Sequence, residues 1–169
     1  ARLKTGPRSS VKAGWSINYQ YVHLASLSAT TTPTDVWLPS SDLVAPQRGR
    51  QFSAGYFVDL GKNREWETSI EVYHKDLSNL VEYAENTRPD QNIGTNTDNN
   101  LVFGQGTSYG AEFFLKRKFG ELNGWVGYTW SKTDRLFEDL NNGDPFPAKF
   151  DRRHDLSIVA DWTPNERWN

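Results

Sequence analysis

Several features are missing from this chain of 169 residues, and each absence narrows its class. There is no cysteine, which excludes disulfides and thiolate metal ligands and is compatible with an exported protein. The net charge is -2, so the charge balance does not favour nucleic acid as a partner. No run of about 18 apolar residues occurs, so no transmembrane helix is predicted, and no signal peptide is visible.

Methionine is also absent, including at position 1. We therefore expect the chain to be a processed product or a piece of a longer protein. The mean hydropathy of -0.73 is typical of soluble proteins, yet aromatic residues make up 14% of the sequence. A low mean hydropathy does not exclude a transmembrane β-barrel, because barrel strands alternate apolar and polar residues and barrel loops are polar.

Alternation of apolar and polar residues with a period of two predicts β-strands, because successive side chains of a strand point to opposite faces. From Val11 to Tyr21 the odd positions are apolar and the even positions are polar. A long hairpin is predicted over residues 104–133, with a tight turn at 120–123. Further strands are predicted at 51–60, 65–75, 80–83 and 156–162, with a bulge near 76–79 and incomplete strands at 1–4 and from Trp168 onward.

The connections between the predicted strands alternate between short and long. Short turns are predicted at 5–8, 61–64, 120–123 and 163–166, and long polar segments at 23–50, 84–102 and 134–151. In an antiparallel up-and-down meander this places all tight turns at one end, as in outer-membrane barrels. Aromatic residues at strand ends also suit a bilayer interface. They are Trp66, Phe119, Trp125, Trp162 and Trp168 beside the turns, and Tyr21, Tyr83 and Trp130 beside the loops.

Two all-β architectures fit this pattern. One is a soluble antiparallel sheet or sandwich whose apolar faces pack on each other. The other is a membrane barrel whose polar face lines a hydrated lumen or packs on a polar plug. A slip of one residue would turn charged side chains to lipid, at a cost of about 2–4 kcal/mol for each Lys or Arg at mid-bilayer. Strand length, the alternating connections and the aromatic ends favour the barrel. The charged side chains are Lys12, Glu65, Glu67, Glu71, Glu112 and Lys116.

Several segments resemble one protein family. Residues 104–116 read Gly-Gln-Gly-Thr-Ser-Tyr-Gly-Ala-Glu-Phe-Phe-Leu-Lys and resemble the Gly-x-Gly-x-Ser-Tyr-Gly-x-Glu strand of TonB-dependent outer-membrane receptors. Residues 24–26, 37–41, 46–47 and 150–155 resemble segments of the Bacteroidetes branch of that family. The resemblance implies that residues 1–169 form part of the barrel domain, with about six complete strands of a 22-stranded parent. The plug domain is absent from the sequence.

The resemblance also implies a function, that of an active transport receptor in the outer membrane of a Gram-negative bacterium. Such receptors bind a scarce ligand on outer loops and move it inward, with work supplied by an inner-membrane TonB complex that acts on the plug. The implied partners are outer-membrane lipids, the remainder of the barrel and plug, the TonB complex through the plug, and a surface lipoprotein. An open sheet of six strands leaves two unpaired edges, so we expect no transport by this chain alone.

Two other function classes are alternatives to a transport receptor. The first alternative is a soluble β-rich binding or adhesion module whose long loops form a recognition face. An outer-membrane enzyme is a third hypothesis, but no paired acid and base residues and no Gly-x-Ser-x-Gly motif are present. No catalytic residue, no cofactor and no metal site are therefore predicted. The histidines, His23, His74 and His154, do not have the spacing of metal ligands.

Candidate ligand contacts are expected in the three long loops, where function concentrates, but no substrate can be assigned. Residues 152–155, Arg-Arg-His-Asp, are interpreted as ion-pairing groups that fix the base of a loop rather than as an anion clamp. The acidic residues Asp134, Glu138, Asp139 and Asp144 lack the calcium-loop pattern and are interpreted as a solvated loop. The candidate contacts with a sugar or peptide are Tyr19, Trp37, Asn92, Asn96, Asn99 and Asn100.

Overall fold

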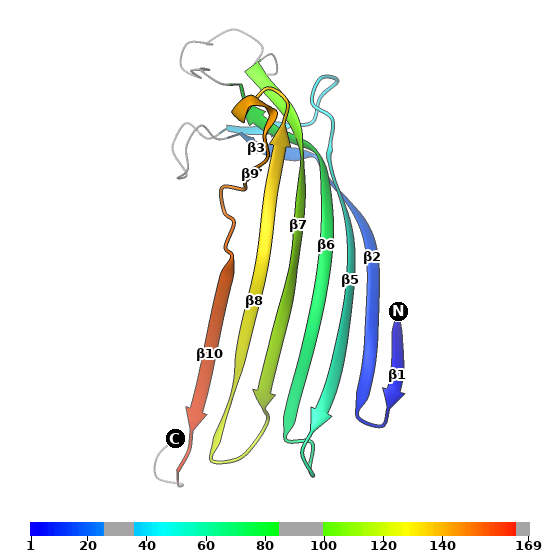
Figure 1. Ribbon diagram of the computed structural model, residues 1–169, viewed down its shortest axis with the longest axis vertical. Helices are drawn as coiled ribbons and strands as arrows, with labels where there is room; N and C mark the ends of the chain where they lie inside the picture. Colours follow the sequence, from blue (N-terminus) through cyan, green and yellow to red (C-terminus); the bar gives the residue numbers. More distant parts are fainter. Residues whose placement is uncertain (26–35, 85–99, 165–169) are drawn as a thin grey trace.

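The chain forms one long, twisted antiparallel sheet, which Figure 1 shows in the computed structural model. The structure describes residues 1–25, 36–84 and 100–164. The strands follow one another across the sheet in the order β1-β2-β5-β6-β7-β8-β10. Their bounds are Arg2–Gly6 (β1), Ser9–Gln20 (β2), Gln47–Leu60 (β5), Trp66–Tyr83 (β6), Leu101–Arg117 (β7), Leu122–Phe137 (β8) and His154–Trp162 (β10).

The predicted all-β, up-and-down meander is confirmed. Every neighbouring pair along the path is antiparallel. The short turns that join β1 to β2, β5 to β6 and β7 to β8 lie together at the lower end of Figure 1, and the long connections lie at the upper end. Within the described residues no helix has the length and apolarity that crossing a membrane requires.

Small elements occupy the long connections, which the sequence predicted as irregular. β3 (Val22–Ala25) and β4 (Val36–Pro39) pair as a separate hairpin. The short 3-10 helix η3 (Asn141–Gly143) and β9 (Phe146–Pro147), which pairs with β8, precede β10. These elements form because backbone N–H and C=O groups near the sheet need hydrogen-bond partners, and short pairings provide them.

The main strands are longer than predicted. β5 begins at Gln47 instead of residue 51, and β6 is continuous from Trp66 to Tyr83. β8 begins at Leu122, so the turn lies at 118–121 rather than 120–123, and it continues to Phe137. Backbone pairing therefore extends through polar residues in which the apolar alternation has stopped. The incomplete strand predicted from Trp168 lies outside the described residues.

A bulge interrupts the pairing of β6 with β7, as the sequence predicted. The register shifts between Ser78 and Leu80, and the intervening Asn79 adopts a φ of 58°. Its side-chain Nδ2 donates a hydrogen bond to the carbonyl oxygen of Pro46 at 3.0 Å. One extra residue on one strand reverses the faces to which the following side chains point.

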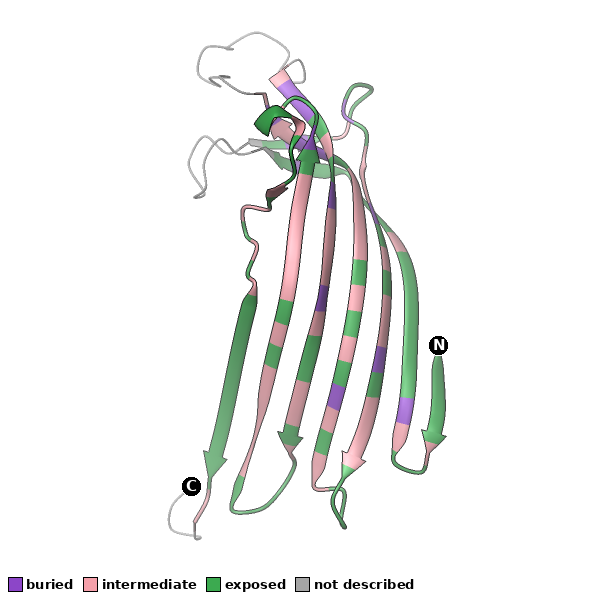
Figure 2. Ribbon diagram, viewed as in Figure 1, coloured by how far each residue is buried: buried purple, intermediate pink, exposed green. Residues whose placement is uncertain are grey.

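The sheet has one apolar and one polar face. A row of register partners crosses six strands on the apolar face, and its side chains are 37–62% exposed: Val11, Tyr56, Ile70, Phe113, Tyr128 and Leu156. The next row along the strands, on the opposite face, reads Lys12, Gly55, Glu71, Glu112, Thr129 and Asp155. Figure 2 shows the resulting alternation of exposed and partly buried residues along the strands. No second layer of described residues covers the apolar face, which argues against a sandwich.

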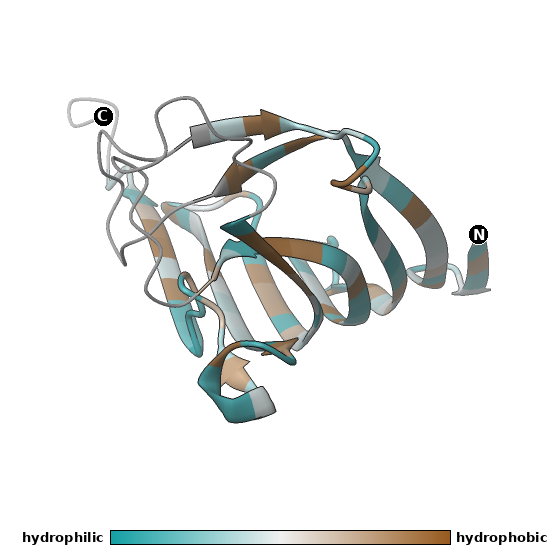
Figure 3. Ribbon diagram, turned by 90° about the horizontal axis from the view of Figure 1, so that it is seen from above, coloured by the Kyte–Doolittle hydropathy of each residue, from teal (hydrophilic) through white to brown (hydrophobic). Residues whose placement is uncertain are grey.

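The polar face is the concave one. Asp59 of β5 pairs with Lys118, in the turn after β7, at 2.7 Å, and Glu82 of β6 pairs with Arg135 of β8. Both pairs reach across an intervening strand, as expected where side chains converge on the inside of a curve. Seen from above in Figure 3, the strands follow an arc that is open on one side. We therefore call the polar face the inner face and the apolar face the outer face.

Aromatic and charged residues bound the apolar band of the outer face at both of its ends. At the turn end Trp66 pairs with Arg117, whose guanidinium lies 5.6 Å from the ring centre. At the other limit His74 stacks on Tyr109, and Asp76 follows it. From Trp66 to His74 the strand rises about 26 Å, which is comparable with the apolar band of roughly 25 Å in outer-membrane barrels.

Candidate functional site

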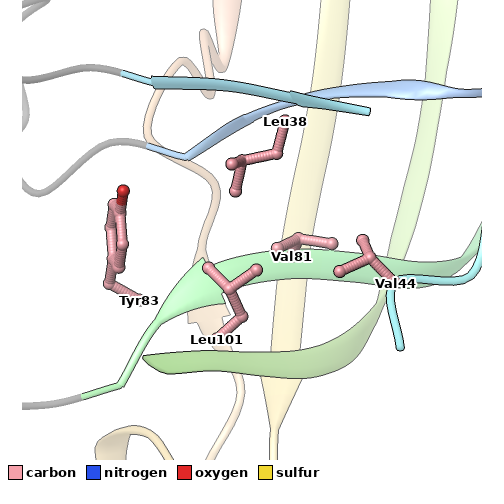
Figure 4. Close-up of a cluster of buried hydrophobic side chains, with 5 residues drawn as sticks. All are labelled: Leu38, Val44, Val81, Tyr83 and Leu101. Atoms are coloured by element: carbon pink, nitrogen blue, oxygen red, sulfur yellow. The ribbon is translucent and has the colours of Figure 1, made fainter. Parts of the chain in front are cut away.

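The loop end of the sheet is organised by two apolar clusters. In Figure 4 the β3–β4 hairpin lies over the ends of β6 and β7, with five side chains between them: Leu38, Val44, Val81, Tyr83 and Leu101. Leu80, Val102 and Phe137 form the second cluster on the other face of these ends. Tyr83 is only 7% exposed, so the expectation that it stands at a bilayer interface is wrong. The clusters hold the loop end in a fixed shape.

A cavity of about 200 Å³ lies beside these clusters, and we call it the mouth pocket. Strand side chains from β2, β5, β6 and β8 meet residues of β3 and of the segment before β10 in its wall. Because non-adjacent strands meet there, the mouth pocket belongs to the inner face, where the curve opens at the loop end. Its lining residues are Gln20, His23, Leu24, Gln47, Leu80, Val81, Glu82, Arg135, Lys149 and Phe150.

An ion pair between Glu82 and Arg135 forms part of the wall. Both side chains are largely buried, and both lie beyond the apolar band, on the loop side. Burial raises the pKa of the Glu82 carboxyl, although the charges of Arg135 and Lys149 and the hydrogen bond from Arg135 act to lower it. The pocket therefore combines a partly desolvated acid with two cations close to it.

His23 contributes a buried imidazole. The residue is 3% exposed, and its Nε2 lies 3.1 Å from the hydroxyl oxygen of Ser40. Burial lowers the pKa of His23, which favours the neutral ring. Its other nitrogen, Nδ1, is buried without a hydrogen-bond partner. A buried polar atom of this kind is available to a ligand that supplies a complementary hydrogen-bonding group.

Two glutamates face each other on the inner wall, about half-way along the strands. Glu71 of β6 and Glu112 of β7 are register partners, and we call them the inner acidic pair. Like charges directly opposite each other destabilise a sheet. Neither carboxylate forms an ion pair with a described residue, and the nearby Lys12 instead lies 3.8 Å from the ring centre of Phe57. A cationic group from elsewhere would relieve this repulsion.

The turn end of the inner face is mainly cationic. A cavity of about 300 Å³ is lined there by cations from β1, β2 and the adjoining turns, together with Asp59 and Glu67. Arg8 Nη1 donates a hydrogen bond to the carbonyl oxygen of Gly61 at 2.6 Å, which joins two neighbouring turns. The inner face thus changes from acidic at mid-height to basic at the turns. The cations are Arg2, Lys4, Arg8, Lys12 and Arg64.

Residues 5–169 match the family model described as TonB dependent receptor-like, beta-barrel. The chain belongs to this receptor family. Members of this family are transport receptors in the outer membrane of Gram-negative bacteria, and the family is not one of enzymes. No curated protein and no solved structure matches the chain.

The histidines of this receptor barrel make separate contacts. His74 Nε2 lies 3.1 Å from Asp76 Oδ1 on the outer face, and His154 Nδ1 lies 2.8 Å from the hydroxyl of Tyr128. In residues 1–25, 36–84 and 100–164 no group of three or more His, Asp or Glu side chains is arranged to hold a metal.

Residues 152–155 lie at the base of the connection to β10 and make local contacts. Arg153 Nη2 donates to Asp151 Oδ2 at 3.0 Å, and Arg152 lies 3.7 Å from Asp155. Asp151 also accepts a hydrogen bond from the backbone N–H of Thr133 at 2.8 Å. This arrangement fastens the connection to β8, as the sequence interpretation proposed.

The candidate ligand residues are not brought together. Tyr19 and Trp37 are both exposed, at 55% and 65%, while Asn92, Asn96 and Asn99 lie outside the described residues. The backbone oxygen of Asn100 accepts a hydrogen bond from the N–H of Ala84 at 2.9 Å. Of the acidic residues, Asp134 pairs with Lys132 at 2.6 Å on the outer face of β8. None of the described candidates lines the mouth pocket or the basic cavity at the turn end.

Sequence reasoning missed the polar residues of the mouth pocket. The signal for Glu82 was the break in alternation near Asn79, because the bulge turns Leu80 and Glu82 to the inner face. Before the bulge the even positions of β6 face outward, and after it they face inward. Arg135 was placed in a loop because the predicted strand ended at residue 133, whereas β8 continues to Phe137.

Proposed function

We propose that this chain is a segment of the barrel of a TonB-dependent uptake receptor of the Bacteroidetes type. The parent barrel has 22 strands, encloses a plug, and imports a nutrient with energy passed from the inner-membrane TonB complex through that plug. A surface lipoprotein is a further partner in this proposal. The observation that supports it most is the pair of adjacent rows at mid-sheet, one apolar and exposed, the other charged and on the inner face.

The two edges of the sheet support a larger barrel. β1 and β10 each have one neighbouring strand among the described residues, so each leaves a row of backbone groups without a partner there. Unpaired backbone groups in lipid are costly, and closure into a barrel removes them. The proposal therefore places further strands of the parent beside β1 and β10.

The inner face supports a polar occupant. The inner acidic pair attracts a cationic group, and the basic cavity at the turn end attracts an anionic one. A plug with charges of opposite sign at these two heights would be held in one orientation. The mouth pocket, at the loop end, then stands where a ligand enters before it reaches the plug.

This chain has no cysteine, so a cysteine introduced into it is the one labelling site within these 169 residues. Single cysteines replace Ile70 and Glu71 in the receptor that carries this chain, and each is labelled with a nitroxide in outer-membrane vesicles. We expect the label at Ile70 to be accessible to oxygen dissolved in lipid, and the label at Glu71 to be shielded from lipid. Equal accessibility to an aqueous nickel reagent at both positions would support the soluble binding module instead.

Uptake itself is tested with cells that express the receptor, supplied with fluorescent pools of peptides and oligosaccharides. We expect accumulation in the periplasm that is lost when the TonB complex is deleted. A receptor that accumulates cargo equally without the TonB complex would contradict the energised mechanism while leaving the barrel assignment intact.

A further inference from the structure

The outer face has a notch near the turn end, where β7, β8 and β10 lie side by side. Two outward positions in one row are small, Gly124 and Ala160, which are register partners. One row nearer the loop end the outward positions are large and apolar: Leu115, Val126 and Ile158. The result is a cavity of about 170 Å³ with an almost wholly apolar lining, which we call the turn-end groove.

The floor of the turn-end groove is fixed by backbone conformation. Gly124 has a φ of +142°, and a Cβ at this position would lie 2.1 Å from the carbonyl oxygen of Val159. No other residue fits there without displacing β10. The groove is therefore built into the pairing of β8 with β10 and does not depend on a side-chain rotamer.

An arginine stands at the rim. Arg117, the register partner of Gly124 on β7, lines the groove and lies over the ring of Trp66. It forms no ion pair with a described residue, and its Nε is buried without a hydrogen-bond partner. A guanidinium that no described carboxylate neutralises, beside an apolar groove, matches a ligand that has an anionic head and an apolar tail.

The position in the membrane identifies the class of ligand. Trp66 marks the turn-end limit of the apolar band, and the short turns of outer-membrane barrels face the periplasm. We propose that the turn-end groove binds one glycerophospholipid of the periplasmic leaflet, with an acyl chain beside Val126 and Ile158 and its phosphate on Arg117. The proposal rests on the outer-membrane location that the family gives, and not on TonB coupling or the identity of the imported ligand.

A second protein chain fits the groove less well. Stable protein interfaces bury on the order of 1,200–2,000 Å², whereas the groove is a shallow notch about 170 Å³ in volume. A single acyl chain needs only a narrow apolar channel, and lipid is already the solvent of this face. Charge complementarity with Arg117 then selects a phospholipid over an uncharged lipid.

Native mass spectrometry of the receptor that carries this chain tests the proposal. The receptor is titrated in mild detergent with phosphatidylglycerol, and with diacylglycerol of the same chains as the phosphate-free probe. We expect one phosphatidylglycerol to remain bound and diacylglycerol to bind weakly. Ala160→Leu fills the notch and should reduce retention about tenfold, because methylenes of the acyl chain lose their apolar contact. Arg117→Gln should reduce retention about fivefold, because one cation near the phosphate is lost.

Two matched controls keep the result specific. Ala13→Leu makes the same change at an exposed, outward position of β2, and Lys62→Gln removes a cation from another turn. Both should bind lipid as the wild type does. Equal retention in all variants, or equal binding of the two lipids, would overturn the proposal. A receptor dimer that Ala160→Leu dissociates would overturn it as well, because the groove would then hold a second copy.

Discussion

At the scale of residues, Glu82 is a partly buried acid in the wall of the mouth pocket. Its pKa lies above the ordinary value of 4.5, chiefly because of burial. An acid whose pKa is raised in the folded state contributes its full stabilisation at pH values below its ordinary pKa. This contribution is lost as the pH rises through the raised pKa. The loop ends of β6 and β7 should therefore be more stable at mildly acidic pH than at neutral pH.

Hydrogen exchange of the receptor, corrected for intrinsic rates, measures this effect. We expect protection of residues 80–83 and 101–104 to increase as pH falls from 7 towards 4.5, and Glu82→Gln to remove most of that dependence. The difference between wild type and variant isolates Glu82 from His23, whose lowered pKa acts with the opposite sign. An identical pH dependence in the two proteins would show that Glu82 is not the group responsible.

At the scale of elements, Gly104 lies where β7 and β8 approach each other closely at the loop end. A Cβ at Gly104 would lie 2.5 Å from the carbonyl oxygen of Leu136 and from the ring of Phe137. Gly104→Ala should therefore destabilise the barrel by about 1–3 kcal/mol, because the pairing must shift. Gly127→Ala is the matched control, since its Cβ would meet only Trp125, at 3.4 Å.

Thermal unfolding of the receptor in detergent, followed by heat-dependent gel mobility, compares the two variants. We expect a lower midpoint for Gly104→Ala and a midpoint near the wild-type value for Gly127→Ala. Equal midpoints for both variants would mean that β8 moves away from β7 at little cost.

Local sequence patterns predicted the elements well where one face is apolar and less well elsewhere. Between Trp66 and His74 the alternation predicts both the strand and the direction of its side chains, because apolar residues face lipid and polar residues face the lumen. Beyond Asn79 both faces of the β6–β7 hairpin are covered. The β3–β4 hairpin covers one face, and Phe137 covers the other. The sequence predicts a strand at 80–83, but the inward direction of Glu82 follows only from the register of the bulge. The mouth pocket also places Gln20 and Arg135 in the lining of one cavity, and no local pattern encodes that arrangement.

At the scale of the whole molecule, the two faces of the sheet predict that neighbouring positions differ in how well they tolerate a lysine. Ile70 faces outward at mid-band and Glu71 faces inward, so the same lysine substitution meets lipid in one case and a polar interior in the other. We expect Ile70→Lys to destabilise the inserted barrel by about 2–4 kcal/mol. Glu71→Lys should cost less, because it ends the repulsion within the inner acidic pair.

Insertion is measured as the fraction of receptor that resists urea extraction from outer membranes and shows heat-dependent mobility. Ile70→Lys should lower this fraction relative to Glu71→Lys at equal expression. The reverse order would place the apolar face inside and contradict the assignment of faces.

The bulge at Asn79 divides β6 into two parts whose residues are under different structural constraints. Below it, each outward position is constrained by the thickness and apolarity of the bilayer. Above it, the same strand supplies a wall of the mouth pocket, and its residues Leu80, Val81 and Tyr83 are buried in the two apolar clusters. A substitution at Leu80, Val81 or Tyr83 would therefore disturb the packing of the loop end, whereas one below the bulge would act on insertion into the bilayer.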